Sequence, residues 1–154
     1  MLLFLDFDGC CHSYKSGVDQ YFRRSEAVLE PWLRLRPQVE VVVSSSWRET
    51  YSLQEMQEFF AEDLRHRIID STPVLLRDGW ASVDGDLLPV RFEREAEILC
   101  WLRQSGQPWS AWAALDDQPW RFKPFCERLV VCGSTVGMTE RELGLVDAIL
   151  GRQR

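Results

Sequence analysis

The sequence predicts an α/β fold, in which a central parallel sheet of about five strands lies between two layers of helices. Short apolar runs typical of buried strands alternate along the chain with segments whose apolar residues recur at helical spacing. Strands that alternate with helices favour a parallel sheet, because the helix carries the chain back to the edge where the next strand begins. With 154 residues, 45% of them hydrophobic, the chain can form a single domain, which we assign to residues 1–154.

The five expected strands are apolar runs rich in Leu, Val and Ile, because a parallel strand is buried on both faces. In chain order they are Leu2–Asp6, Val39–Ser44, Arg67–Asp70, Ser110–Leu115 and Leu129–Cys132. We expect the order 3-2-1-4-5 across the sheet, which places the first and fourth strands side by side.

Four helices are expected, over about 25–35, 52–64, 92–104 and from about 140 onward. Ser25 is the expected cap of the first helix, and Pro31 inside that span means that the helix begins later or bends. The last helix has the clearest start, because Thr139 and Glu142 match the T-x-x-E capping box ahead of an apolar face.

Two connecting segments carry no regular apolar pattern. Residues 10–24 are polar and irregular, and we expect them to form a flap after the first strand. Residues 71–91 include Asp78-Gly79 and Asp84-Gly85, which are dipeptides typical of turns. This second segment therefore predicts a small lid or hairpin insertion.

The composition narrows the classes of partner. A formal net charge of −6 argues against broad, sequence-independent binding of nucleic acid, which needs a basic surface. No apolar run approaches the roughly 20 residues that cross a bilayer, and the run from Met1 to Leu5 is too short for a signal peptide. Five cysteines without ligand-like spacing indicate reduced thiols, and adjacent Cys10-Cys11-His12 lacks the spacing of a zinc site. We therefore expect a cytoplasmic protein with no membrane partner; the sequence indicates no oligomeric state.

The most informative residues are two pairs of aspartates that follow expected strands. Asp6 and Asp8 precede Gly9 at the end of the first strand, and Asp116-Asp117 follow the fourth. The expected strand order brings both pairs to the carboxyl edge of the sheet, where ligands of open α/β sheets bind. Such carboxylates can hold a hard cation, and one of them can attack an electrophile. A lone D-x-D-G is more often a turn that closes a strand, but the second pair favours a chemical site.

Four motifs at strand ends or helix starts resemble, in order, those of the haloacid dehalogenase (HAD) superfamily of phosphohydrolases. They are D-x-D-G after the first strand, Ser44-Ser45-Ser46-Trp47-Arg48 after the second, Arg91 or Arg94 at the third helix, and Asp116-Asp117 after the fourth strand. More narrowly, S-S-S-W-R, R-x-x-E-I-x-x-W-L, L-D-D and G-M-T are similar to a small HAD subgroup whose members occur alone or beside RNA-repair modules. The resemblance covers nearly the whole chain and implies a Rossmann-like three-layer sandwich with a minimal cap.

The resemblance also implies a Mg²⁺-dependent phosphohydrolase that works through an aspartyl-phosphate. Asp6 would be the nucleophile, and Asp8 would protonate the leaving oxygen and then activate water as a base. Mg²⁺ would be held by Asp6, by the backbone carbonyl of Asp8, and by Asp116 or Asp117.

Phosphate binding falls, by the same resemblance, to the second and third motifs. Ser45 matches the subgroup's position best, although Ser44 and Ser46 stand beside it. Arg48 is either a phosphate ligand or a surface residue.

The third motif and the residue after the first motif depart from the usual family pattern. Arg94 would replace the family's lysine, and we favour it over Arg91 because it lies one helical turn before Ile98. Cys10 stands where many members carry Thr or Val, which would place a thiol close to the nucleophile and make it sensitive to oxidation.

The short flap and small insertion imply an open site. An open site accepts a phosphate carried on something large, such as a nucleic-acid end or a protein side chain, whereas small metabolites need more enclosure. Trp47 and Trp120 lie near the expected mouth, either as rim residues or as stacking partners for the substrate. Two alternatives remain: a HAD-fold binding or regulatory domain without turnover, and a phosphotransferase.

Overall fold

The centre of the protein is a five-stranded parallel sheet. The computed structural model describes residues 1–17, 20–77, 80–83, 86–89 and 91–153. Its sheet strands are β1 (Leu2–Leu5), β2 (Glu40–Val43), β3 (Ile68–Ser71), β7 (Trp112–Asp116) and β8 (Leu129–Val131). They lie in the order β3-β2-β1-β7-β8, and every neighbouring pair is parallel. The predicted order 3-2-1-4-5 is therefore confirmed, with β7 as the fourth strand and β8 as the fifth.

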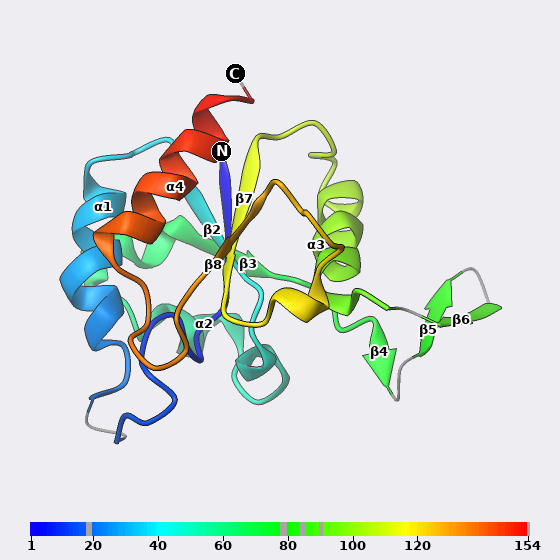
Figure 1. Cartoon of the computed structure of the whole chain (residues 1–154), viewed down its shortest axis with the longest axis horizontal. Coiled ribbons are helices and arrows are strands. Elements are labelled where there is room, and N and C mark those ends of the chain that lie inside the picture. The colour runs from blue at the N-terminus through cyan, green and yellow to red at the C-terminus, as the bar shows by residue number, and fades with distance from the viewer. Residues whose placement is uncertain (18–19, 78–79, 84–85, 90, 154) are drawn as a thin grey trace.

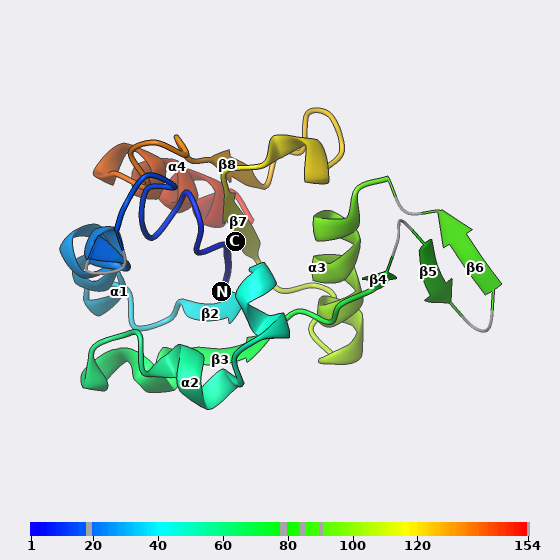
Figure 2. The ribbon, with the colours of Figure 1, turned by 90° about the horizontal axis from the view of Figure 1, so that it is seen from below.

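Helices cover both faces of this sheet, so the predicted three-layer sandwich is also confirmed. Figures 1 and 2 show α1 (Glu30–Arg34) and α4 (Glu140–Gly151) on one side and α3 (Glu93–Gln104) on the other. Alternate residues of β1 face opposite layers: Leu3 and Leu5 join the core under α1 and α4, and Leu2 and Phe4 join the core under α3.

The first helical segment differs from its prediction. A π-helical turn over Ser25–Leu29 precedes α1, and the capping position falls on Arg24, whose backbone is already helical. The prediction that Ser25 caps this helix is wrong, because Ser25 is buried inside the turn and a cap needs an extended backbone. Leu35, at the end of the expected span, is 79% exposed.

The second predicted helix is shorter than 52–64. Its α-helical part is α2 (Leu53–Gln57), which begins at a capping box formed by Ser52 and Glu55. The chain then turns at Phe59 and Phe60, and a 3₁₀ segment over Glu62–Arg67 leads into β3. At this turn Phe60 packs into the core. By contrast, the capping box predicted for the last helix is present, since Thr139 and Glu142 bond each other's backbone at the start of α4.

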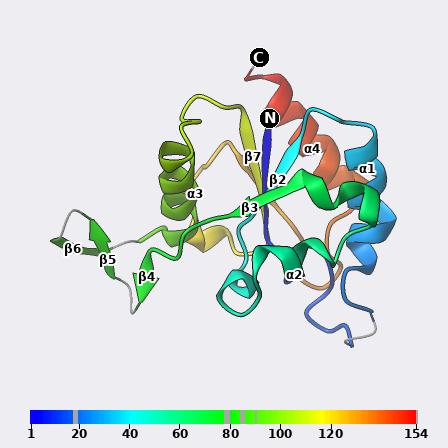
Figure 3. The same ribbon diagram turned by 180° about the vertical axis from the view of Figure 1, so that it is seen from behind.

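A second, antiparallel sheet lies within residues 71–91. It consists of β4 (Leu76–Arg77), β5 (Trp80–Val83) and β6 (Asp86–Pro89), in that order. Figures 1 and 3 show it beyond α3, at the side of the central sheet. The predicted turns at Asp78-Gly79 and Asp84-Gly85 lie outside the described residues. Among the described helices, none has the length and apolar character needed to cross a membrane.

Candidate active site

Three carboxylates meet where β1 and β7 end. β1 and β7 are paired with Leu5 opposite Leu115, and the Asp6 amide donates to the Leu115 carbonyl at 2.9 Å. This register places Asp6 beside Asp116 and Asp117, and one oxygen from each of the three side chains lies within 4.8 Å of the others. All three side chains are buried. The predicted convergence of the two acidic motifs is therefore present in the fold.

This group fits a small divalent cation. Asp116 Oδ2 and Asp117 Oδ1 are buried without a hydrogen-bond partner in the described part of the chain. Buried polar atoms are normally paired, so unpaired carboxylate oxygens that face one another indicate a place for a positive ligand. Carboxylate oxygens alone, without thiol or imidazole, suit a hard cation such as Mg²⁺. The side chain of Asp8 is not part of the group, which leaves only its backbone carbonyl for the expected metal contact.

The electrostatics of these carboxylates point the same way. Burial raises the pKa of Asp116 to about 7, and the nearby charge of Asp6 adds to the shift. Burial, again with the charge of Asp6, raises the pKa of Asp117 to about 6. Burial also raises the pKa of Asp6, against the opposing effect of Arg94. A bound cation would remove this mutual repulsion and favour the ionised forms.

Gly9 makes room for Asp117. Its φ is +68°, a conformation that favours glycine, and a Cβ at this position would lie 2.2 Å from Asp117 Oδ2. No side chain fits there unless Asp117 moves. The glycine of the first motif is thus required by the carboxylate of the fourth.

Asp8 occupies a different environment from the other three. His12 Nε2 lies 3.0 Å from Asp8 Oδ1, and the indole Nε1 of Trp47 donates to Asp8 Oδ2 at 3.0 Å. These hydrogen bonds, that of His12 first, hold the pKa of Asp8 below its ordinary value despite partial burial. Each oxygen of Asp8 therefore has a ring nitrogen as its partner.

Arg94 lies in the first turn of α3, on the other face of the sheet from α1 and α4, and its side chain reaches the acidic group. Its side chain is 1% exposed, and its Nε lies 3.6 Å from Asp116 Oδ2. Arg94 Nε and Nη1 have no hydrogen-bond partner among the described residues. Arg91, the alternative, is exposed, so the structure brings Arg94 to the site and leaves Arg91 outside.

Of the three serines after β2, Ser45 is the one that contacts Asp6. It is fully buried, and a hydrogen bond from its side chain lowers the pKa of Asp6. Its Oγ also accepts from the Trp47 amide at 3.5 Å, at the start of the 3₁₀ turn Ser46–Glu49. Ser44 is buried with its Oγ unpaired among the described residues, and Ser46 is exposed.

Arg48 is a buried ion-pair partner. Its Nη2 lies 2.7 Å from Glu97 Oε2, and both side chains are 5% exposed. Its Nη1 donates to the Ser45 carbonyl at 2.5 Å. The surface alternative for Arg48 is therefore wrong: Glu97, one helical turn after Arg94, draws its side chain inward, where it supports the backbone of Ser45.

The thiol of Cys10 is shielded. Its side chain is fully buried, and burial raises its pKa well above the ordinary value. Because the thiolate is the form that oxidants attack, this environment does not support the expected sensitivity to oxidation.

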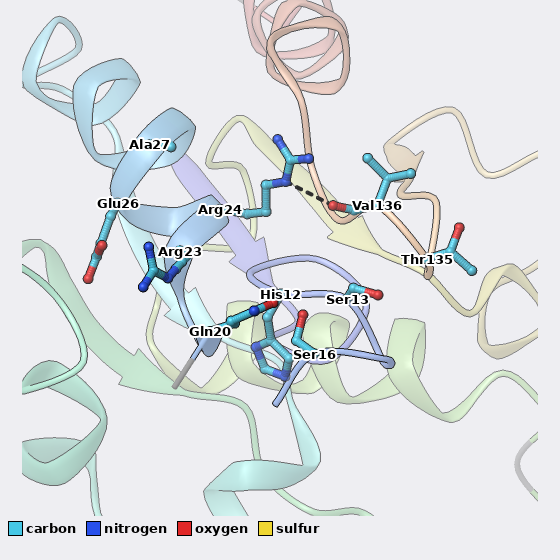
Figure 4. A pocket seen from close by; sticks show the side chains of 10 residues that line it. All are labelled: His12, Ser13, Ser16, Gln20, Arg23, Arg24, Glu26, Ala27, Thr135 and Val136. Carbon is cyan, nitrogen blue, oxygen red and sulfur yellow. Dashed lines mark hydrogen bonds between the residues drawn. The ribbon is translucent and has the colours of Figure 1, made fainter. Parts of the chain in front are cut away.

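The flap is tied to the loop ahead of α4. The Met138 amide donates to the Cys10 carbonyl at 2.8 Å, and Arg24 Nε donates to the Val136 carbonyl at 2.9 Å. Between these segments lies a pocket of about 680 Å³, and Figure 4 shows His12 among its lining side chains. The residues 133–139 thus hold the flap, and with it His12, against the body of the domain.

Sequence reasoning missed two residues of this site. In the sequence His12 stands beside two cysteines and suggests at most a zinc ligand. Its signal is the spacing of four residues from Asp8, which permits direct contact in a tight turn. Glu97 belongs to the R-x-x-E motif, and its signal is the spacing that places it on the same helical face as Arg94. Trp120 is 67% exposed, whereas Trp47, the other predicted rim residue, touches Asp8 directly.

Comparison with known proteins gives one family. A family model described as the HAD domain in Swiss Army Knife RNA repair proteins matches residues 2–143. Neither the curated proteins nor the solved structures contain a significant match. The match spans every residue placed in the site above.

Proposed function

Because the chain belongs to the family of HAD domains found in Swiss Army Knife RNA repair proteins, we propose that it is a Mg²⁺-dependent phosphomonoesterase with Asp6 as nucleophile. The family supports a phosphoesterase-type function in general terms. The observation that carries the finer proposal is the arrangement of carboxylates: three buried ones share a space, and a fourth stands apart on two ring N–H partners.

Mg²⁺ would be held by Asp6, Asp116 and Asp117 with the backbone carbonyl of Asp8, and it would neutralise the charge that otherwise repels a phosphate. Arg94 contributes positive charge from the other side, since its unpaired nitrogens are available to a phosphoryl oxygen. The Ser45 hydroxyl would bind another phosphoryl oxygen.

The reaction then divides between Asp6 and Asp8. An Asp6 oxygen attacks phosphorus, the bond from phosphorus to the leaving oxygen breaks, and Asp8 gives that oxygen a proton. Asp8 next takes a proton from water, whose oxygen attacks phosphorus and releases phosphate from Asp6. The lowered pKa of Asp8 keeps it ionised, as the base of the second step must be. The negative charge of a bound phosphate would raise that pKa and favour the protonated form that the first step needs.

The proposed substrate is a phosphate on a large molecule, with a nucleic-acid end as the first candidate. The small antiparallel sheet lies beyond α3, and the name of the family points to RNA repair. The end of a nucleic-acid strand is bound through only a few phosphates and so needs no broad basic surface. Such a substrate is compatible with a net charge of −6.

The test is turnover of phosphomonoesters with and without Mg²⁺. We expect Mg²⁺-dependent release of phosphate, and a loss of at least about a thousand-fold in Asp6→Asn. Asp63→Asn, a change at an exposed aspartate paired with Arg34, serves as the control and should retain activity. Full activity in Asp6→Asn would overturn the assignment of the nucleophile, and inactivity of the wild type across nucleotides, phosphorylated oligonucleotides, phosphopeptides and sugar phosphates would favour a binding domain.

A further inference from the structure

A pocket of about 520 Å³ has Trp47, a hydrogen-bond partner of Asp8, in its wall. It is lined by Tyr21, Ser46, Trp47, Glu49, Thr50 and Tyr51. Trp47 belongs both to the pocket wall and to the site, because its indole Nε1 donates to Asp8 Oδ2. The volume lies within the range of small-molecule sites, roughly 300–1,000 Å³. The pocket is therefore a direct neighbour of the group that serves the leaving oxygen.

A tyrosine ring stacks on each of the two side chains that bond Asp8. Tyr21 stacks on His12 with ring centroids 4.3 Å apart and planes at 22°. Tyr51 stacks on Trp47 with centroids 5.3 Å apart and planes at 27°. Tyr21 is 36% exposed and Tyr51 is 38% exposed, so both keep ring surface open to a ligand.

Three aromatic rings, those of the buried Phe7 and Phe22 and of the partly buried Phe59, hold this wall in place. Phe7, Phe22 and Phe59 each meet the Trp47 ring edge-on, with centroids 5.5–5.8 Å away. Edge-to-face packing of this kind fixes ring orientation. The wall is thus formed before a ligand arrives, which reduces the entropy lost on binding.

Polar groups at the pocket distinguish between ligands. Ser46 and Thr50 offer hydroxyls, and Glu49 offers an exposed carboxylate. These groups can bond the N–H and carbonyl edges of a heterocycle, whereas a hydrocarbon ring leaves them unused. Glu49 would also repel a second phosphate, so the pocket favours an uncharged part of the substrate over more of its backbone.

From this geometry we propose that the pocket binds the base of the phosphorylated terminal nucleotide, stacked against Tyr21, Trp47 and Tyr51. The proposal rests on the proposed function, because it takes Asp8 as the group that protonates the leaving oxygen. The organic group attached to that oxygen must lie against Asp8, and the adjoining hollow walled by rings receives it. Stacking on aromatic side chains tolerates any base, so this site selects nucleotides without selecting a sequence.

The test compares esters that differ only in the base. Adenosine 5′- and 3′-monophosphate are each measured against the ribose phosphate with the same ester position. We expect the mononucleotide to have the higher kcat/KM in at least one pair, and Tyr51→Ala to lower the ratio of the two values about ten-fold, in the range of one lost stacking contact. Tyr51→Phe keeps the ring and should keep the ratio.

Trp109→Ala is the matched control for removal of an exposed aromatic ring. Trp109 is 95% exposed and precedes β7, so it lies at the edge of the sheet opposite the site. Its replacement should leave the ratio unchanged. An equal fall in Trp109→Ala and Tyr51→Ala would contradict the assignment of the pocket.

Binding separates this inference from the proposed function. Calorimetric titration of Asp6→Asn with the same pairs needs no turnover. Tighter binding of the mononucleotide, lost in Tyr51→Ala, would support the pocket even if the wild type hydrolysed nothing. Equal affinity and equal turnover of each pair would overturn the proposal, as would a Tyr51-dependent preference for phenyl phosphate or phosphotyrosine peptide without a preference for the mononucleotides.

Discussion

The four aspartates of the proposed site fall into two kinds according to their surroundings. Asp6, Asp116 and Asp117 are buried with too few donors, and burial raises the pKa of each of them. Asp8 has two ring N–H partners, and its pKa is lowered. Carboxyl groups whose pKa values are shifted in opposite directions commonly take different roles in catalysis. The shifts are consistent with cation binding by Asp6, Asp116 and Asp117 and with proton transfer by Asp8.

Gly9 provides a test of the shared space. We expect Gly9→Ala to destabilise the protein and to weaken Mg²⁺ binding, because its Cβ would displace Asp117. Gly106→Ala is the matched control, since Gly106 also has a positive φ of +72° but no atom within 4 Å of its added Cβ. Gly106→Ala should cost about 1 kcal/mol through backbone strain alone. Thermal unfolding and calorimetric Mg²⁺ titration measure both effects, and equal Mg²⁺ affinity in the two variants would contradict the role given to Gly9.

At the scale of elements, a buried ion pair joins the turn after β2 to α3. Arg48 in the turn pairs with Glu97 in the helix, and Glu97 Oε1 also accepts from the Leu75 amide at 3.3 Å. The same helix carries Arg94 into the site one turn earlier. The pair therefore links the turn that carries the serine motif to the helix that carries Arg94.

The ion pair predicts a non-additive response to mutation. Glu97→Gln leaves a buried guanidinium without its counter-charge, and we expect a loss of about 3 kcal/mol in the free energy of unfolding by urea. The double variant Arg48→Met with Glu97→Met should lose less than Glu97→Gln, because no isolated charge remains. Asp63→Asn, which breaks the exposed pair with Arg34, should change stability little. A loss in the double variant as large as that in Glu97→Gln would show that the pair does not act as a unit.

The three central strands β1, β2 and β7 were predictable because each is an apolar run buried on both faces. The start of α4 was predictable because Thr139 and Glu142 form a local capping signal. The first two helices were mispredicted in extent because tertiary packing decides them. Ser25 looks like a cap but is buried inside a π-turn, and Phe60 fits a helical stripe but turns into the core. Local signals cannot reveal which face the core will accept.

The same distinction holds in the site. Asp6 and Asp116 could be brought together from the sequence, because strand order alone places them side by side. The contacts of Asp8 with Trp47 and of Arg48 with Glu97 join residues 39 and 49 positions apart in the chain. They depend on how the turn after β2 packs, and no periodic pattern records that packing.

For the whole molecule, the raised pKa values make stability depend on pH and on Mg²⁺. In the unfolded chain an aspartate loses its proton near pH 3.8, whereas in the folded protein Asp117 and Asp116 lose theirs near 6 and 7. The stabilisation that these two groups contribute to the folded protein is therefore fully present below pH 4. It is lost as the pH rises through 6 and 7. We expect the metal-free protein to melt about 5 °C lower at pH 8 than at pH 5, and excess Mg²⁺ to reduce the difference by replacing the protons.

Two variants test whether the acidic group causes this dependence. Asp117→Asn should flatten the fall of melting temperature between pH 5 and pH 8 in the metal-free protein, since it removes one of the titrating groups. Glu58→Gln, at an exposed carboxylate after α2, should leave the dependence unchanged. Identical pH profiles in wild type and Asp117→Asn would place the cause elsewhere.

The bond between the flap and the loop ahead of α4 has a consequence for how the protein is made. The hydrogen bond from Arg24 to Val136 spans 112 positions of the chain, and β1 finds its partner β7 over a similar distance. A nascent chain on the ribosome therefore carries Asp6 long before it carries Asp116, Asp117 and the loop that holds the flap. Such long-range closure slows folding, and the site would form in one late step rather than by gradual assembly.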